Sequence, residues 1–268
     1  MSCPYRFVMR VLGAGRSRIH SMPTAMAIGP APLERAEPLF GAEAMRAADS
    51  AAHARHAMPS ILLMERAGLA TAQAIIDRYA PCRVVVLAGS GNNGGDGLVV
   101  ARHLAEAGYS VRVLAPGGDR PKTEDAMTNA RVAESLGIRI EPFDPELGPP
   151  DLIVDAMLGT GARGEPRGAV GEAVGWVEHT GAPVVACDVP TGVDADTGEV
   201  AGAAIEAEVT VSYHGNKVGL NIEPGRSRAG VVVVADIGIP SDVRVEASAW
   251  RAGRSVLVGL PRKAAASE

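Results

Sequence analysis

The stretch that decides the fold runs from residue 84 to residue 97: Val84-Val85-Val86-Leu87-Ala88-Gly89-Ser90-Gly91-Asn92-Asn93-Gly94-Gly95-Asp96-Gly97. Its first five residues are apolar and mostly β-branched, which is typical of a strand buried on both faces. Glycines follow, and a helical pattern then extends from about residue 97 to residue 107. A buried strand, a glycine loop and a helix in this order are typical of a parallel sheet covered by helices.

The same alternation continues along the chain. Further strands are expected at 111–115, 152–158, 184–189, 209–213 and 231–237, and helices at 123–136 and 168–179. Ahead of the first strand, helical spacing from Gly41 to Tyr79 is interrupted at Met58-Pro59-Ser60, so we expect two helices, with Ser60 as N-cap of the second. This pattern predicts the α/β class: a Rossmann-like, doubly wound, mostly parallel sheet with helices on both faces, preceded by two helices.

Composition excludes several classes of partner. The chain has 268 residues, a formal net charge of −5 and only 3% aromatic residues, so neither a basic surface nor a stacking platform for nucleic acid is expected. Its three cysteines are odd in number and widely spaced, which argues against a disulfide framework and favours a reducing, cytoplasmic location. No apolar stretch reaches the roughly 18 residues of a membrane span.

The ends of the chain differ in texture from its middle. Residues 1–40 contain four arginines before the first acidic residue, Glu34, and we expect a disordered leader there, with a transit peptide as the alternative. Residues 41–240 are expected to form one domain. Residues 241–268 are expected to be a C-terminal tail or a truncated linker to a further domain.

The glycine loop carries more polar groups than a turn requires. Gly89, Gly91 and Gly94 satisfy the G-x-G-x-x-G pattern, but no acid stands about 20 residues later to bind a ribose hydroxyl. The alternative is a purely structural role, a tight turn with Asp96 as the helix N-cap. Because asparagines also stand in this loop, we expect it to bind a ligand through hydrogen bonds.

Two later strands also end in acids. Asp155 lies near the end of one apolar run and Asp188 near the end of the next. Carboxyl ends of parallel strands share one edge of the sheet, so the two acids should converge there, where partial burial favours general acid or base chemistry. His214 and Lys217 follow the next strand and reach the same edge. Cys187 is expected to be a core thiol.

These segments together resemble the NAD(P)H-hydrate epimerase family, whose domain is also the N-terminal half of bifunctional NAD(P)H-hydrate repair enzymes. The resemblance covers residues 41–240. It rests on the following motifs: Met58-Pro59-Ser60, Met64-Glu65-Arg66-Ala67-Gly68, Gly91-Asn92-Asn93-Gly94-Gly95-Asp96-Gly97, Gly159-Thr160-Gly161, Asp188-Val189-Pro190-Thr191-Gly192-Val193-Asp194, Gly215-Asn216-Lys217-Val218-Gly219-Leu220 and Asp236-Ile237-Gly238-Ile239-Pro240. Thr191 stands where the family usually has Ser, Arg66 replaces a common Asn, and Val218 a common Pro.

The resemblance implies a homodimeric isomerase that interconverts the R and S hydrates of NADH and NADPH, in partnership with an NAD(P)H-hydrate dehydratase. It implies Asp188 as the catalytic acid, and one potassium ion per subunit on Asn93, Asp155 and Thr191. The implied substrate-binding residues are Asn92, Asn93, Gly94, Gly95, Asp96, Gly159, Thr160, Gly161, Ala162, Arg163, Gly164, Glu165 and Asp188. The alternatives are an NAD(P)-dependent oxidoreductase, or a non-catalytic nucleotide-binding or scaffold module of the same fold.

Overall fold

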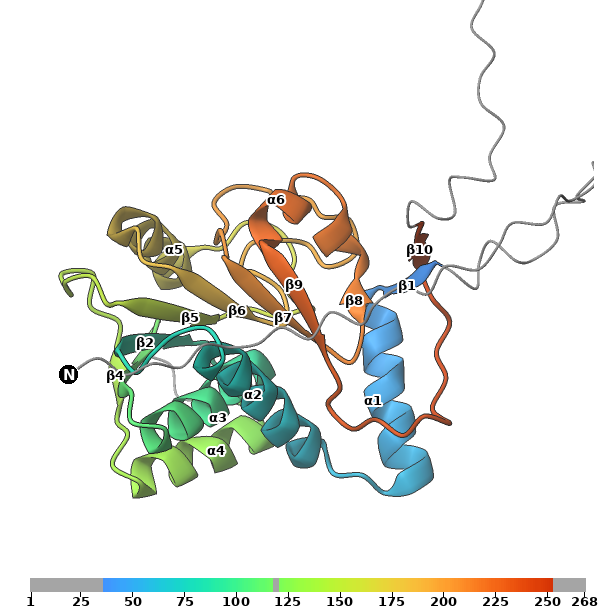
Figure 1. Ribbon diagram of the computed structural model, residues 1–268, viewed down its shortest axis with the longest axis horizontal. Helices are drawn as coiled ribbons and strands as arrows, with labels where there is room; N and C mark the ends of the chain where they lie inside the picture. The colour runs from blue at the N-terminus through green and yellow to red at the C-terminus, as the bar shows by residue number, and fades with distance from the viewer. Residues whose placement is uncertain (1–35, 118–120, 253–268) are drawn as a thin grey trace, which may run out of the picture.

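A parallel sheet of seven strands forms the centre of the molecule (Figure 1), in a computed structural model that describes residues 36–117 and 121–252. The strands lie in the order β4-β3-β2-β5-β6-β7-β9. Their bounds are β2 (Arg83–Ala88), β3 (Ser110–Ala115), β4 (Ile140–Pro142), β5 (Leu152–Ala156), β6 (Val184–Cys187), β7 (Val209–Tyr213) and β9 (Val231–Ala235). The chain proceeds from β2 toward one edge and then returns to place β5 on the other side of β2. The order of the strands therefore reverses between β2 and β5.

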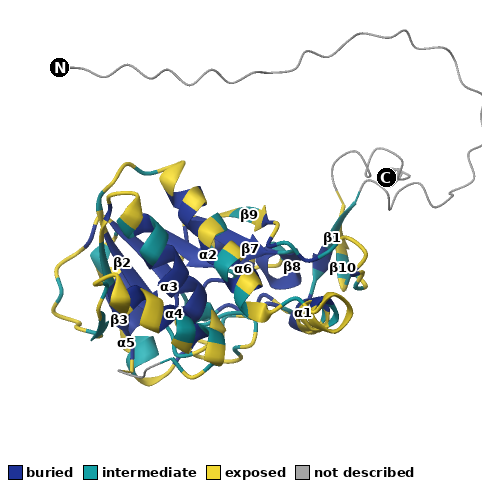
Figure 2. Ribbon diagram, turned by 90° about the horizontal axis from the view of Figure 1, so that it is seen from below, coloured by how far each residue is buried: buried dark blue, intermediate teal, exposed yellow. Residues whose placement is uncertain are grey.

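Helices cover both faces of this sheet. Helices α2 (Ser60–Ile76), α3 (Asn92–Glu106) and α4 (Glu124–Ser135) lie on one face, and α5 (Gly168–Thr180) lies on the other (Figure 1). Alternate residues of β2 divide between the two layers, because Val84 and Val86 pack in the larger apolar cluster and Val85 and Leu87 in the smaller one. Figure 2 shows buried residues concentrated in the strands and on the helix faces turned toward them. The predicted fold class is confirmed.

A second, small sheet pairs the first and last described strands of the chain with a strand from the middle. It has the order β10-β1-β8, from β1 (Glu37–Phe40), β8 (Asn216–Lys217) and β10 (Ala249–Arg251). Residues 37–40 and 249–251 fall in the segments that the sequence assigns to a leader and a tail; strands this short carry too few residues to show a recognisable alternation. The expectations for residues 1–35 and 253–268 lie outside the described residues.

Helix α1 (Ala42–His56) follows β1 and stands beside the strand ends (Figure 1). Two hydrogen bonds to residues distant in the sequence hold the start of this helix. The Ala42 backbone N–H donates to Asp196 Oδ1 at 2.6 Å, and the Gly41 N–H donates to Ser248 Oγ at 2.9 Å. The fold closes with a 3-10 turn (Val218–Asn221) and α6 (Gly225–Ala229). Within residues 36–117 and 121–252, no helix has both the length and the apolar character that crossing a bilayer requires.

Two expectations about helix starts are wrong. Helix α3 begins at Asn92 rather than near residue 97, so Asp96 lies inside the helix and cannot be its N-cap. Helix α2 has Pro59 as its N-cap residue, and Ser60 is already helical. Glycine disfavours helix, but close packing demands it here: a Cβ on Gly94 would lie 1.8 Å from the Gly89 carbonyl oxygen. Tertiary contact thus outweighs local propensity.

Candidate functional site

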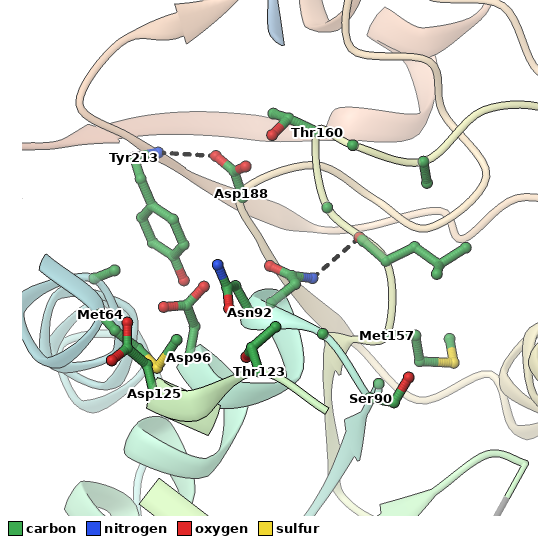
Figure 3. Close-up of a pocket in the computed structure, with 18 of the residues that line it drawn as sticks. Met64, Ser90, Asn92, Asp96, Thr123, Asp125, Met157, Thr160, Asp188 and Tyr213 are labelled. Carbon is green, nitrogen blue, oxygen red and sulfur yellow. Dashed lines mark hydrogen bonds between the residues drawn. The ribbon is translucent and has the colours of Figure 1, made fainter. Parts of the chain in front are cut away.

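A cavity of about 770 Å³ opens at the carboxyl edge of the large sheet (Figure 3). The loops after β2, β3, β5, β6 and β7 line it, together with α1 and α2. This edge includes the point where the strand order reverses, which is the usual place for a ligand in an open α/β sheet. The cavity brings together most of the residues that the sequence singles out. Those that line it are Asn92, Asn93, Asp96, Gly159, Thr160, Gly161, Ala162, Asp188, His214 and Lys217.

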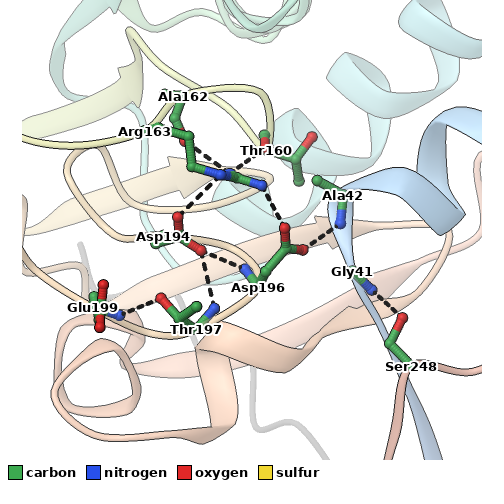
Figure 4. A network of polar contacts seen from close by, with 10 residues as sticks. All are labelled: Gly41, Ala42, Thr160, Ala162, Arg163, Asp194, Asp196, Thr197, Glu199 and Ser248. Carbon is green, nitrogen blue, oxygen red and sulfur yellow. Dashed lines mark hydrogen bonds and ion pairs between the residues drawn. The ribbon is translucent and has the colours of Figure 1, made fainter.

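Other expected substrate-binding residues support the cavity from behind or lie beside it. Gly94 and Gly95 are buried within α3. The Arg163 guanidinium turns to Asp194, at 3.1 Å, and to Asp196 (Figure 4). Arg163 therefore holds one loop against another. Gly164 and Glu165 follow it and are also absent from the cavity lining.

The two acids that Arg163 contacts are turn residues. Asp194 Oδ1 accepts the backbone N–H groups of Asp196 and Thr197 at 2.8 and 2.9 Å (Figure 4). Cys187 is fully buried, as expected of a core thiol, and burial raises the pKa of its thiol.

Asp188 and Lys217 form a buried ion pair at the cavity wall. The Lys217 Nζ lies 2.6 Å from Asp188 Oδ1, and the lysine side chain is 1% exposed. Nζ also donates to the Tyr213 carbonyl oxygen at 2.7 Å, while the Tyr213 N–H donates to Asp188 Oδ1 at 3.3 Å. The strand end and the lysine therefore fix the carboxylate in one orientation.

The backbone around this pair is strained. Asp188 has a φ of 66° and His214 a φ of 63°, both in the left-handed region that side chains other than glycine rarely adopt. Each such conformation costs on the order of 1–3 kcal/mol and persists where the surrounding structure imposes it, often at functional sites. Asp188 thus combines a strained backbone with a place in the cavity lining.

Two further carboxylates reach the same cavity. Asp96 comes from α3 and is 9% exposed; burial and the charge of Asp188 raise its pKa well above the usual range. Asp49 comes from α1, where burial and then the charge of Asp188 raise its pKa to about 6, against the opposing effect of Lys217. Sequence reasoning missed Asp49, because an acid in an amphipathic helix carries no pattern that ties it to a strand end.

A second cluster, made of oxygen atoms, lies behind the loops. Asp155 accepts the Thr191 hydroxyl and the Thr191 N–H, each at 2.7 Å, and the Met157 N–H at 3.2 Å. Burial raises the pKa of Asp155 to about 6, although these hydrogen bonds oppose the shift. The Asn93 amide nitrogen donates to the Leu158 carbonyl at 3.0 Å, whereas the buried Asn93 Oδ1 has no hydrogen-bond partner among the described residues.

This cluster suits a hard cation. Hydrogen bonds through the Leu158 backbone link Asn93, which has an unpaired buried oxygen, to the Thr191 hydroxyl and so to the Asp155 carboxylate. Oxygen donors of these kinds are what such ions prefer. The three residues expected to bind potassium therefore come together from three elements: the first turn of α3, the end of β5 and the loop after β6.

Comparison with known proteins agrees with this geometry. The family described as YjeF-related protein N-terminus matches residues 60–219. The NAD(P)H-hydrate epimerase of Limosilactobacillus fermentum is 41% identical over 201 residues, covering 75% of this chain and 97% of the relative. The bifunctional NAD(P)H-hydrate repair enzyme Nnr of Salinibacter ruber is 42% identical over 222 residues, covering 76% of this chain but 41% of that longer protein.

A solved structure extends the likeness to three dimensions. The crystal structure of yeast ynu0, YNL200c, superposes with a TM-score of 0.63 at 26% identity, covering 79% of this chain and 95% of the yeast chain. The sequence and structural comparisons therefore agree on the family of the chain. The chain belongs to the family of YjeF-related N-terminal domains.

Proposed function

We propose that this protein is an NAD(P)H-hydrate epimerase, an isomerase that interconverts the R and S forms of hydrated NADH and NADPH. The observation that carries the proposal is the Asp188–Lys217 pair, a fixed carboxylate in a large cavity at the switch point of the sheet. Family membership and near-complete coverage of a relative named NAD(P)H-hydrate epimerase support it.

The cavity offers polar groups suited to a dinucleotide. Asn92 and Asn93 begin α3, so their side chains stand beside backbone N–H groups that have no partner within the helix and can hold a phosphate. The loop from Gly159 to Ala162 lines another wall of the cavity. We assign these two segments to substrate binding.

Inversion at the hydrated ring carbon requires that hydroxide or water leaves and returns on the other face, or that the ring opens and closes again in an equivalent way. Proton transfer by a positioned side chain accelerates such steps by about 10²–10⁴-fold. Asp188 is the side chain best placed for this role. Its strained backbone and its contacts with Lys217 and Tyr213 fix the carboxylate before substrate binds.

A potassium ion, one per subunit, completes the proposed site. Asn93, Asp155 and Thr191 would hold it through their oxygen atoms, and the unpaired Asn93 Oδ1 supports this assignment. When bound, the ion would supply positive charge near the loops that hold the substrate. A cytoplasmic homodimer working with an NAD(P)H-hydrate dehydratase is the cellular setting we propose; relatives named bifunctional repair enzymes support the functional link.

Asp188→Asn tests the assignment, because it removes the proton-accepting carboxylate while keeping the shape of the side chain. The assay follows conversion of the pure R hydrate of NADPH to the S hydrate by the wild type and the variant. We expect a loss of about 10²–10⁴-fold for Asp188→Asn. Asp242→Asn is the matched control, because Asp242 is 63% exposed and does not line the cavity.

The outcomes distinguish the competing functions. Normal conversion by Asp188→Asn would remove Asp188 from catalysis. If the wild type binds the hydrates without converting them, the protein is a binding module. Hydride transfer from intact NADPH would instead indicate an oxidoreductase.

A further inference from the structure

We propose that Asp49 is a second catalytic acid/base in this cavity, serving the face of the substrate ring that Asp188 does not serve. The inference rests on the proposed epimerase function and adds to it a residue outside the segment that the family comparison matches, residues 60–219. It starts from the geometry of α1. Asp49 lines the cavity from this helix, together with Met45 and Arg46, whereas Asp188 enters from the end of β6.

The fold fixes Asp49 relative to Lys217. Strand β1, which leads into α1, pairs with β8 in parallel, and Phe40 lies opposite Lys217 in that register. The Ala42 N–H bond to Asp196 holds the first turn of the helix. Figure 1 shows α1 standing directly beside β8. Pairing of β1 with β8 therefore positions α1, and with it the Asp49 carboxylate, at the cavity.

Around Asp49, three carboxyl groups of the cavity share one buried cation. Asp49, Asp96 and Asp188 influence one another electrostatically, and Lys217 is the cation that acts on all three. The other charged or titratable groups that line the cavity are Arg46 of α1, Asp125 of α4, Arg167 before α5, Tyr213 of β7 and His214 after β7. A dinucleotide carries phosphates, so a cluster of carboxylates is unfavourable for binding unless positive charge develops on the substrate near it.

Epimerisation develops such a charge. When the bond between the ring carbon and its hydroxyl oxygen breaks, the oxygen keeps the bonding electron pair and takes a proton from the first carboxylic acid, leaving as water. The ring nitrogen lone pair forms a double bond to that carbon, which gives an iminium cation. A water molecule then adds to the other face and gives one proton to the second carboxylate. One acid has lost a proton and the other has gained one, so the reverse reaction restores both.

This route uses two carboxyl groups in different protonation states. Asp188, paired with the Lys217 ammonium, is the carboxylate that accepts the proton, and Asp49 suits the role of the proton-donating acid better than Asp96. Asp96 is 9% exposed and lies within α3, so its burial keeps the proton in place. Asp49 is accessible from the cavity although the surrounding protein partly desolvates its carboxyl, and its raised pKa of about 6 lets it hold or release a proton near neutrality. Like charges that share a site favour a single proton between them.

The test compares Asp49→Asn with Glu43→Gln, a control on the same helix that is exposed and does not line the cavity. Conversion of R to S hydrate is measured from pH 5 to pH 9 with kcat and KM separated. For Asp49→Asn we expect kcat to fall about 10²–10⁴-fold with little change in KM, and the pH-dependent limb near 6 to disappear. Glu43→Gln should match the wild type. For Asp49→Ala, added formate should restore rate in proportion to its concentration.

The possible outcomes distinguish a catalytic role of Asp49 from a structural one. A wild-type kcat and an unchanged pH profile in Asp49→Asn would overturn the proposal while leaving the epimerase function intact. So would a loss of activity that formate does not restore and that accompanies a lowered unfolding temperature, since this pattern indicates a structural role. If the wild type converts neither hydrate, the proposed function fails, and the role of Asp49 fails with it.

Discussion

Removal of the buried ammonium by Lys217→Met should destabilise the protein strongly. Methionine approximates the length of the lysine stem, so the change deletes the charge with little loss of packing volume. It leaves the Asp188 carboxylate, which is 13% exposed, without its partner 2.6 Å away, and leaves the Tyr213 carbonyl without the Nζ donor. Breaking a buried ion pair by removing one partner costs about 3–5 kcal/mol.

The expected loss is easily measured by thermal unfolding at pH 7. A domain of this size shifts by about 2–4 °C for each kcal/mol, so Lys217→Met should lower the unfolding temperature by roughly 6–20 °C. Arg228→Met is the control. Arg228 pairs with Glu206 at 3.3 Å, where the two side chains are 37% and 72% exposed, and such a surface pair contributes at most about 1 kcal/mol.

The loss should also depend on pH in a defined direction. Lys217 lowers the pKa of Asp49, so without it that pKa should rise further above about 6. A carboxyl whose pKa is higher in the folded protein than in the unfolded chain gains stability as the pH falls. The gap between Lys217→Met and the wild type should therefore narrow from pH 7 to pH 5. A loss at pH 7 no larger than that of Arg228→Met would refute this reasoning.

Three other predictions concern glycine, protonation and the cation. Gly94→Ala should lower the free energy of unfolding, measured in urea, by at least about 1–3 kcal/mol, because the new Cβ would lie 1.8 Å from the Gly89 carbonyl oxygen. Gly91→Ala is the control and should leave it unchanged, because a Cβ there would meet nothing within 4 Å. Asp49→Asn should be more stable than the wild type at pH 7.5, by a margin that shrinks from pH 6 to pH 4 as the native carboxyl takes up its proton; a margin independent of pH would contradict this. Thr191→Val should abolish any rise in unfolding temperature produced by potassium, whereas Thr191→Ser should keep it, and an equal response in both variants would exclude the hydroxyl as a ligand.

Much of the site could be anticipated from the sequence. The acids at the ends of β5 and β6 and the asparagines after β2 stand at strand ends, and in a parallel sheet all such ends share one edge. Their convergence therefore followed from the order of strands and helices, without knowledge of any distance. The resemblance to the NAD(P)H-hydrate epimerase family, drawn from the same motifs, is confirmed by the relatives.

Contacts between distant segments could not be anticipated in this way. Nothing in the helical pattern of residues 42–56 indicates that Asp49 faces the strand ends, because pairing of β1 with β8 decides where that helix stands. Arg163 has the residue type and position of a phosphate-binding group, yet two turn acids from another loop hold it.

The sequence by itself determined the fold class, the sheet edge that carries the site and most of the polar residues at that edge, because these depend on periodicity and chain order. The tertiary structure alone decided which polar groups meet: Asp188 pairs with Lys217, both influence Asp49 electrostatically, and the Asn93 amide oxygen is buried without a partner among the described residues. The physical reason is the distance along the chain over which each property is determined. Periodic burial is a local property of the chain, whereas the protonation of a carboxyl depends on neighbours within a few ångströms that can be more than a hundred residues away.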